Sequence, residues 1–296
     1  MLCNDLSYNN FTSQNSSDFS CQIRETNLFA SYSTDNVSKE VSCLGNNICS
    51  TSSTSLYIDC GGNGVSVGNK DYEGDFVSGG ASHFSSTDNR WGFSNTGHFL
   101  DDDQHDSYIL TSSSQVPINN SELYMNARTS AISLTYYGFC MRNGSYNVTL
   151  HFAEIAFTDD TKFSSLGRRV FDIYIQGMLV EKDFDISDRA GGVGKAIVTT
   201  YTVNVTTSLE IRLYWAGKGT INVPTRGRYG PLISAISVDP CEGLKTLGVA
   251  LSDNLEELAL TNCDVIKEQN GFLVELAQNL KKIKILDLSL QSYSAR

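Results

Sequence analysis

The sequence predicts an all-β fold, an antiparallel β-sandwich of the jelly-roll type, followed by a short α/β C-terminal segment. Three observations predict the sandwich. Residues 55–240 contain short runs of alternating apolar and polar residues, Gly, Asn, Asp or Ser separate these runs, and no helical periodicity lies between them. Two sheets that bury their apolar faces against each other explain this pattern.

The N-terminal segment, residues 1–54, is rich in Ser and Asn and has almost no periodicity, so we expect an irregular, cysteine-containing lead-in. Its opening "LSYNNF" is an exception. Leu6, Asn9 and Phe11 have the L-x-x-N-x-F spacing of one turn of a leucine-rich repeat. One partial copy cannot bury a repeat core by itself.

Seven runs are expected to form the strands of the sandwich. In one of them, Leu209, Ile211 and Leu213 share a face with Trp215, while the residues between them face the other way. The seven runs cover residues 55–63, 131–141, 146–157, 168–180, 196–205, 209–215 and 231–238.

The C-terminal segment, residues 241–296, contains two copies of a leucine-rich-repeat spacing. The first copy, "LEELALTNC" (255–263), fits L-x-x-L-x-L-x-x-C, and a second copy begins at Ile283, about 28 residues later. Between the copies, "GFLVELAQNLKKI" has apolar residues at helical spacing. We therefore predict a leucine-rich-repeat-like tail of one and a half strand-helix repeats, which is too short to bury its own core.

Composition limits the classes of partner. The 296-residue chain carries 22 basic and 33 acidic residues, a net charge of -11, so nucleic acid is not expected as a partner. No apolar run of about 18 residues is present to span a membrane. The start of the chain has neither a basic region nor an apolar region of signal-peptide type, and we interpret the chain as a fragment or an incomplete gene model of an extracellular protein.

Cysteine spacing favours disulfides over metal binding. The eight cysteines form no C-x-x-C pair and no Cys/His cluster at zinc spacing, so no metal and no cofactor is predicted. Cys43 with Cys49 and Cys60 with Cys140 are the candidate pairs, and the connectivity stays open.

Seven N-glycosylation sequons give mild support for secretion, because about four or five would arise by chance in a sequence this rich in Asn, Ser and Thr. Asn147 and Asn204 are expected to face water, because both lie opposite apolar neighbours on alternating strands. The sequon asparagines are Asn10, Asn15, Asn36, Asn119, Asn143, Asn147 and Asn204.

Long motifs connect the chain to a known family. "LYIDCGGN", "RWGFSNTGHFLDDD", "HFAEIAF", "LGRRVFDIYIQG", "WAGKGTINVP" and "RGRYGPLISAISV" closely resemble the malectin domain of plant leucine-rich-repeat receptor-like kinases. The similarity runs from about Asn27 to Asp239. It implies a malectin-like sandwich on the extracellular side of the plasma membrane, and "LSYNNFT" is similar to the end of the repeat array that precedes this domain in the family.

The resemblance also has departures. In the family, a transmembrane helix and a Ser/Thr kinase follow the domain, whereas no kinase motif follows Asp239 here, so we expect this chain not to be an enzyme. Animal malectin binds a diglucose through loop aromatics and an acidic residue. This chain has Ala156 and Phe157 where the animal protein has two aromatics, and the acidic position falls near Gly230. Only part of that sugar site carries over.

A sugar site on a sandwich needs flat rings and fixed polar groups on loops at one end of the sheets. Trp91 and Trp215 are two aromatic residues that could supply such rings, although a core position is more usual for Trp215. The alternative is that the rings fill the core and that the arginines pair with carboxylates such as Asp172 or Glu154. The predicted ligand-binding residues are Tyr136, Tyr137, Phe157, Arg226, Arg228 and Tyr229.

Other motifs are interpreted as structural. "FLDDDQHD" (99–106) lacks EF-hand spacing and is expected to be an acidic surface turn. "YIDCGGNGVSVG" lacks the dinucleotide spacing and should form a tight turn. His151 and Glu154 have no nucleophile nearby in sequence, so no catalytic residue is predicted.

The leading hypothesis is therefore an extracellular ligand-recognition module of a receptor-like kinase, which binds a carbohydrate, a peptide or a receptor or co-receptor protein. Two alternatives stay open. One is a sandwich-fold glycoside hydrolase that uses acidic residues of the "DDD" or "HFAE" stretches, and the other is a spacer that binds nothing small.

Overall fold

The structure is a computed structural model of the 296-residue chain. It describes residues 52–87, 90–100, 108–112, 121–157, 166–206, 208–221 and 228–241, together with five short strands outside these ranges.

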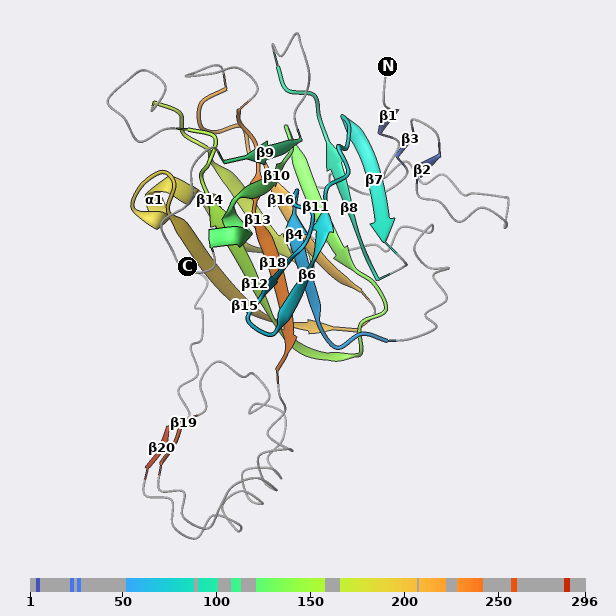
Figure 1. The fold of residues 1–296 in the computed structure, drawn as a ribbon, viewed down its shortest axis with the longest axis vertical. Coiled ribbons are helices and arrows are strands. Elements are labelled where there is room, and N and C mark those ends of the chain that lie inside the picture. Colours follow the sequence, from blue (N-terminus) through green and yellow to red (C-terminus); the bar gives the residue numbers. More distant parts are fainter. Residues whose placement is uncertain are drawn as a thin grey trace.

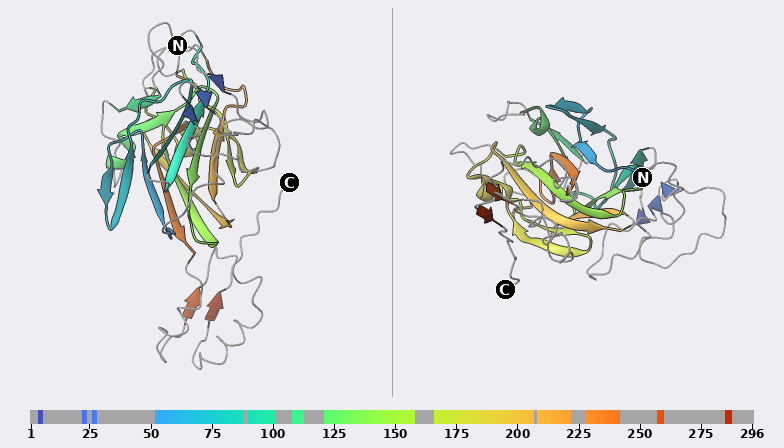
Figure 2. Two further views of the ribbon diagram at one scale, coloured as in Figure 1. Left: turned by 90° about the vertical axis from the view of Figure 1, so that its right-hand side faces the viewer. Right: turned by 90° about the horizontal axis from the view of Figure 1, so that it is seen from below.

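Two six-stranded sheets pack face to face as a β-sandwich, which confirms the predicted fold class (Figures 1 and 2). The first sheet has the order β14 (Met178–Phe184), β13 (Phe171–Ile175), β16 (Leu209–Tyr214), β11 (Ser133–Gly138), β8 (Trp91–Thr96) and β7 (Ser82–Thr87). The second has the order β15 (Ala196–Val205), β12 (Gly144–Ala153), β18 (Ala235–Pro240), β4 (Leu56–Cys60), β6 (Lys70–Asp75) and β5 (Val65–Val67). Neighbouring strands are antiparallel except for β4 and β6, which are parallel.

The apolar faces of the two sheets form one continuous core. Leu209, Ile211 and Leu213 are at most 1% exposed, as their alternation predicts. From the facing sheet, Val148 and Leu150 are fully buried. This core fixes the ends of the strands and so positions the loops that join them.

A small third sheet covers one end of the sandwich. It consists of β17 (Leu232–Ile233), β10 (Asn126–Thr129) and β9 (Ile109–Thr111), and the 3-10 helix η1 (Ser121–Tyr124) precedes β10. One short helix, α1 (Ile186–Ala190), corrects the expectation that helices are absent. Asp185 caps its N-terminus through a hydrogen bond to the Asp188 amide, and Gly191 ends it in the left-handed region.

Five strands lie outside the continuous described ranges. β1 (Asn4–Asp5), β3 (Thr26–Asn27) and β2 (Gln22–Ile23) form one small sheet, and β2 and β3 contact β7. β19 (Glu257–Ala259) pairs in parallel with β20 (Ile285–Asp287), in the register that joins Leu258 to Leu286. A parallel pair at this spacing is what a leucine-rich repeat would form, and the repeat itself stays a prediction.

The cysteines correct one predicted disulfide. Cys60 is a free thiol buried in the core, and burial raises the pKa of this thiol well above its usual value. Cys140 is disulfide-bonded, so the pairing of Cys60 with Cys140 is wrong. The physical reason is distance, because Cys60 ends β4 at one end of the sandwich and Cys140 follows β11 at the other. Cys43 and Cys49 lie outside the described residues.

Three sequon asparagines lie on or beside the hairpin of β12 and β15. Asn143 and Asn204 are exposed, and Asn147 is half-buried, with its Oδ1 accepting a hydrogen bond from the Thr202 hydroxyl. Their glycosylation stays a prediction, and the other sequons, at Asn10, Asn15, Asn36 and Asn119, lie outside the described residues. No helix in the described part of the chain is long and apolar enough to cross a membrane.

Candidate functional site

The strand directions bring several loops together at one end of the sandwich. The chain leaves β6, β8 and β12 at this end and enters β13 and β17 there, beside the third sheet (Figure 1). We call this surface the loop end. Its described residues are 76–81, 97–100, 154–157, 166–170, 215–221 and 228–231.

A buried arginine holds the first part of the loop end. Arg128 on β10 is 0% exposed, and its Nε and Nη2 donate to the carboxylate of Asp75, with Nη2 2.9 Å from Oδ1. Nη2 also donates to the backbone carbonyl of Val77. The guanidinium lies 4.1 Å from the ring centroid of Phe93, and the Tyr136 hydroxyl donates to the same carboxylate. This network ties the loop after β6 to the third sheet.

The electrostatics of this network are set by burial. Burial raises the pKa of Asp75 to about 6, although the Arg128 charge and the hydrogen bonds from Arg128 and Tyr136 act in the opposite direction. A buried ion pair specifies geometry more than it adds net stability, whereas removing one partner leaves an uncompensated charge. The pair therefore fixes the position of the loop after β6.

A second buried arginine holds the other part of the loop end. Arg169 and Glu154 have side chains that are 1% exposed, and Nε of Arg169 donates to Oε2 of Glu154 at 2.7 Å. Nη1 and Nη2 of Arg169 donate to the backbone carbonyls of Gly230 at 2.7 Å and Arg228 at 3.1 Å. The other oxygen of Glu154 accepts the Ala156 amide at 2.8 Å. The ion pair of Arg169 with Glu154 thus connects the loop after β12 to the segment before β17.

Gly230 makes this arrangement possible. Its φ is +77°, and a Cβ atom at this position would lie 2.0 Å from the backbone oxygen of Ser130. Only glycine allows the two backbone segments to approach this closely.

Tyr229 supports the same loops from inside. Its ring contacts the ring of Phe99 at 5.4 Å in an edge geometry and the ring of Trp215 at 5.0 Å. Its hydroxyl accepts the Leu100 amide at 2.9 Å and donates to the His98 carbonyl at 3.4 Å. Tyr229 therefore joins the segment before β17 to the segment after β8.

The predicted ligand-binding residues mostly lie in the interior. The exposed fractions are 1% for Tyr136, 3% for Tyr137, 6% for Phe157 and 2% for Tyr229. Arg228 is half-buried, and Arg226 lies outside the described residues. The structure brings Phe157, Arg228 and Tyr229 together around Arg169 and Gly230. Tyr136 belongs to the Arg128 network, and Tyr137 stacks on Phe139 on the other face of β11.

Sequence reasoning missed both buried arginines, although a signal was present for Arg169. Glu154 continues the inward face of Leu150 and Phe152, and Arg169 continues the inward face of Phe171 and Ile173. An acidic and a basic residue that each continue the buried face of a strand predict a buried ion pair between them.

Large apolar side chains are exposed at the loop end. Phe76 is 64% exposed, Leu100 is 54% exposed and Leu166 is 60% exposed. Two of them belong to loops whose backbone is held by the contacts above, because Arg128 donates to the Val77 carbonyl and the Leu100 amide donates to the Tyr229 hydroxyl. Leu166 lies three residues before Arg169. The loop end therefore offers apolar side chains on an ordered frame.

His151 is structural in this fold. On the outer face of β12, its Nδ1 lies 3.1 Å from the Tyr124 hydroxyl and its Nε2 lies 3.0 Å from the Ser237 hydroxyl. Burial, together with the charge of Lys70, lowers the pKa of His151 to about 4. The neutral imidazole is therefore the form that the folded state favours.

We predict that His151→Gln makes stability less sensitive to acid. The unfolded chain binds a proton at His151 below about pH 6.5 and the folded chain only near pH 4, so the contribution of His151 is present at pH 7 and is lost as the pH falls. Between pH 7 and pH 5, the wild type should lose about 2 kcal/mol more than the variant. Urea unfolding of both proteins at the two pH values measures this, and equal losses would contradict the assignment.

Among the described residues, no group of three or more His, Cys, Asp or Glu side chains is arranged to hold a metal ion. Glu154, which the hydrolase alternative requires as an acid or base, is held by Arg169 in the interior. The acidic stretch 101–106 lies outside the described residues.

Comparison with known proteins identifies the family. Residues 54–236 match the model of the malectin domain. A probable leucine-rich-repeat receptor-like serine/threonine-protein kinase of Arabidopsis thaliana is 49% identical over an alignment of 248 positions, which covers 80% of this chain and 23% of that protein. Another such kinase of the same plant is 40% identical over an alignment of 306 positions, which covers 99% of this chain and 30% of the relative.

Among solved structures, that of the plant receptor-like kinase ANX2 superposes with a TM-score of 0.41 and 17% identity, covering 64% of this chain and 48% of that one. The chain spans about a quarter of the length of the curated relatives named above. On the family-model match, the chain belongs to the malectin domain family, and its relatives are plant leucine-rich-repeat receptor-like kinases.

Proposed function

We propose that this chain is a non-enzymatic recognition module of a receptor-like kinase ectodomain and that it binds a peptide or protein partner across the loop end. The observation that carries the proposal is the distribution of side chains there. Phe76, Leu100 and Leu166 are more than half exposed, while the rings of Phe157 and Tyr229 are packed inside.

Exposed apolar side chains on an ordered backbone suit a protein surface or a peptide, because a few large anchors supply most of the binding energy in such interfaces. The buried arginine pairs reduce the entropy lost on binding, because the loops they hold are already ordered. The chain also carries a net charge of -11, which favours encounter with basic partners.

Carbohydrate is the alternative ligand class. A pyranose face needs an accessible ring, and the four predicted rings are at most 6% exposed. A sugar at the loop end would therefore have to stack on Phe76, which is 64% exposed, or on Trp215, which is half-buried. The other large side chains exposed there, Leu100 and Leu166, are aliphatic and offer a sugar no ring. This makes a peptide or protein the better supported ligand.

The test is a parallel screen of the full chain against a panel of secreted peptides and receptor ectodomains and against a glycan array. We expect saturable binding of a peptide or protein. The Phe76→Asp protein should lose at least about tenfold in affinity for it, because hot-spot anchors of an interface contribute about 2 kcal/mol or more.

Met178→Asp is the matched control. Met178 is 63% exposed, close to the 64% of Phe76, and it begins β14 at the opposite end of the sandwich. Its substitution should leave the affinity unchanged. Binding of glycans only would overturn the proposed ligand class, and equal loss in both variants would overturn the proposed surface. Silence in both screens would support the spacer alternative.

A further inference from the structure

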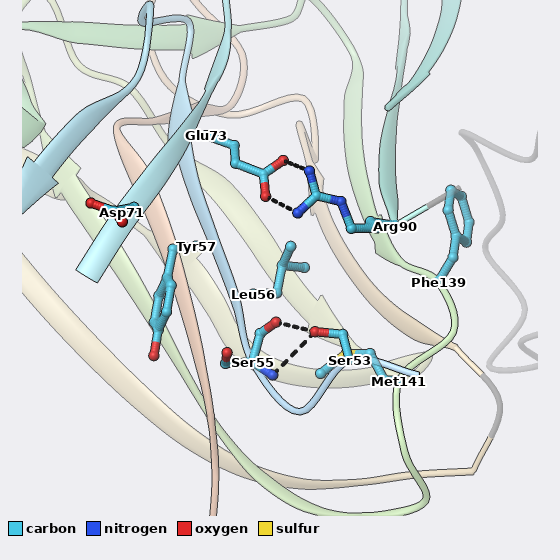
Figure 3. A pocket seen from close by; sticks show the side chains of 9 residues that line it. All are labelled: Ser53, Ser55, Leu56, Tyr57, Asp71, Glu73, Arg90, Phe139 and Met141. Atoms are coloured by element: carbon cyan, nitrogen blue, oxygen red, sulfur yellow. Dashed lines mark hydrogen bonds and ion pairs between the residues drawn. The ribbon is translucent and has the colours of Figure 1, made fainter. Parts of the chain in front are cut away.

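A pocket lies between the two sheets at the end opposite the loop end (Figure 3). Its volume is about 190 Å³. Sites for whole drug-sized ligands have about 300–1,000 Å³, so this pocket has room for a single side chain. It is lined by Ser53, Ser55, Leu56, Tyr57, Asp71, Glu73, Arg90, Phe139 and Met141.

The frame of this pocket is fixed by backbone contacts. The Ser53 amide donates to the Cys140 carbonyl at 2.9 Å, and the Phe139 amide donates to the Arg90 carbonyl at 2.7 Å. Cys140 is itself disulfide-bonded. The pocket is therefore a built feature of the fold, and its walls come from both sheets.

Two carboxylates lie on one wall of the pocket. Asp71 and Glu73 are two residues apart on β6, so their side chains lie on the same face about 7 Å apart. Glu73 accepts hydrogen bonds from the Trp91 indole at 2.9 Å and from Nη2 of Arg90 at 2.9 Å. Asp71 is exposed and accepts the Ser66 hydroxyl at 2.6 Å.

Arg90 shows which group this wall recognises. Its Nη1 also lies 2.6 Å from Oε1 of Glu73, and the side chain reaches in from the chain before β8 while remaining 51% exposed. In Figure 3 the guanidinium faces the Glu73 carboxylate, with Leu56 below the pair. The pair is bidentate, so it is stronger than a typical surface ion pair, and solvent screens it because the Arg90 side chain is half exposed. A partner arginine would therefore have to compete with Arg90 for Glu73. The pocket thus already holds a guanidinium from its own chain.

We propose that this pocket binds an arginine side chain of a peptide or protein partner. The planar guanidinium can donate to Asp71 and Glu73 together, which the point charge of a lysine does less well. Leu56, Phe139 and Met141 supply an apolar wall for its methylene groups. The inference rests on the proposed function for the class of partner, and it uses no residue of the loop end.

The two tryptophans of the chain report on the two ends separately. The Trp91 indole N–H donates to Glu73 in the pocket, and the Trp215 indole N–H donates to the Lys218 carbonyl at the loop end. Indole ¹H–¹⁵N NMR signals of the full chain can therefore be followed while Nα-acetyl-arginine amide is added. The neutral isostere Nα-acetyl-citrulline amide is the matched control ligand.

We expect the Trp91 signal to move saturably with capped arginine at up to about 50 mM, the range that one or two charge-assisted hydrogen bonds provide. The Trp215 signal should not move, and capped citrulline should have no effect. Asp71→Asn should weaken binding about tenfold. Asp188→Asn, the same charge change on exposed α1, should not. Arg90→Gln should tighten binding several-fold, because it removes the competing guanidinium.

Three results would overturn the inference: a Trp91 signal that stays fixed, an equal response to citrulline, or a response that survives Asp71→Asn. Its failure can be told apart from failure of the proposed function. Loss of partner binding in Phe76→Asp with a silent Trp91 signal would refute only the pocket, whereas a responsive Trp91 signal without any loop-end partner would refute only the loop-end surface.

Discussion

Replacing Arg128 with methionine is expected to lower the free energy of unfolding by about 3–5 kcal/mol at pH 7, because it leaves a buried carboxylate without its partner. Asp75 is 1% exposed, so water does not replace the lost hydrogen bonds. The pKa of Asp75, already about 6, should rise further in the variant. The deficit should then shrink as the pH falls from 7 to 5, because the folded variant holds a proton on Asp75 throughout more of this range, whereas the folded wild type takes up that proton only near pH 6.

The double variant Arg128→Met with Asp75→Leu is the control. Apolar side chains that replace both members of a buried pair are often tolerated, so this protein should recover most of the loss. Denaturant unfolding of the four proteins in the cycle measures the coupling. A loss below about 1 kcal/mol in the single variant, or no recovery in the double variant, would contradict the role assigned to the pair.

The second large effect is expected for Arg169→Met. This change strands the Glu154 carboxylate and leaves the carbonyls of Arg228 and Gly230 without their donors, so the free energy of unfolding should fall by about 3–5 kcal/mol. The segment before β17 should also loosen around Trp215, which packs on Tyr229. Unfolding curves and the emission maximum of Trp215 in a Trp91→Phe background report the two effects.

The neighbouring Arg168 provides a matched control for this prediction. Its side chain is 65% exposed and pairs with Asp185. Arg168→Met should therefore leave stability and Trp215 emission close to those of the wild type. Equal effects of the two substitutions would show that the Arg169 network does not hold the loop end.

Alternation of apolar residues was sufficient to predict the sandwich, because strands such as β16 bury one face completely and leave a period of two in the sequence. The polar strands β6 and β7 leave no such pattern. "KDYEGD" and "SHFSST" lie toward one edge of their sheets, where partial exposure admits polar residues on both faces. Their existence depends on pairing with strands distant in sequence.

The site was harder to predict than the fold. Tyr136 and Tyr137 are adjacent on β11 and point to opposite faces, yet both are buried: Tyr136 lies in the core between the sheets, and Tyr137 packs with Phe84 and Phe139 on the other face. Sequence indicates that aromatics gather there and does not show which neighbours cover them. Likewise, Arg128 finds Asp75 only once β10 is placed over the end of β6, which is a matter of register between distant segments.

The central claim is that ligands are recognised by exposed side chains of the loop end, while the buried rings hold its frame. The most direct measurement compares the affinity of Phe76→Asp and Phe157→Leu proteins for a partner found in the screen. Phe157→Leu removes a ring that is 6% exposed and keeps most of its apolar volume. The account predicts at least about a tenfold loss for Phe76→Asp and less than about a twofold change for folded Phe157→Leu. The reverse order would contradict it and would show that the ligand stacks on the rings.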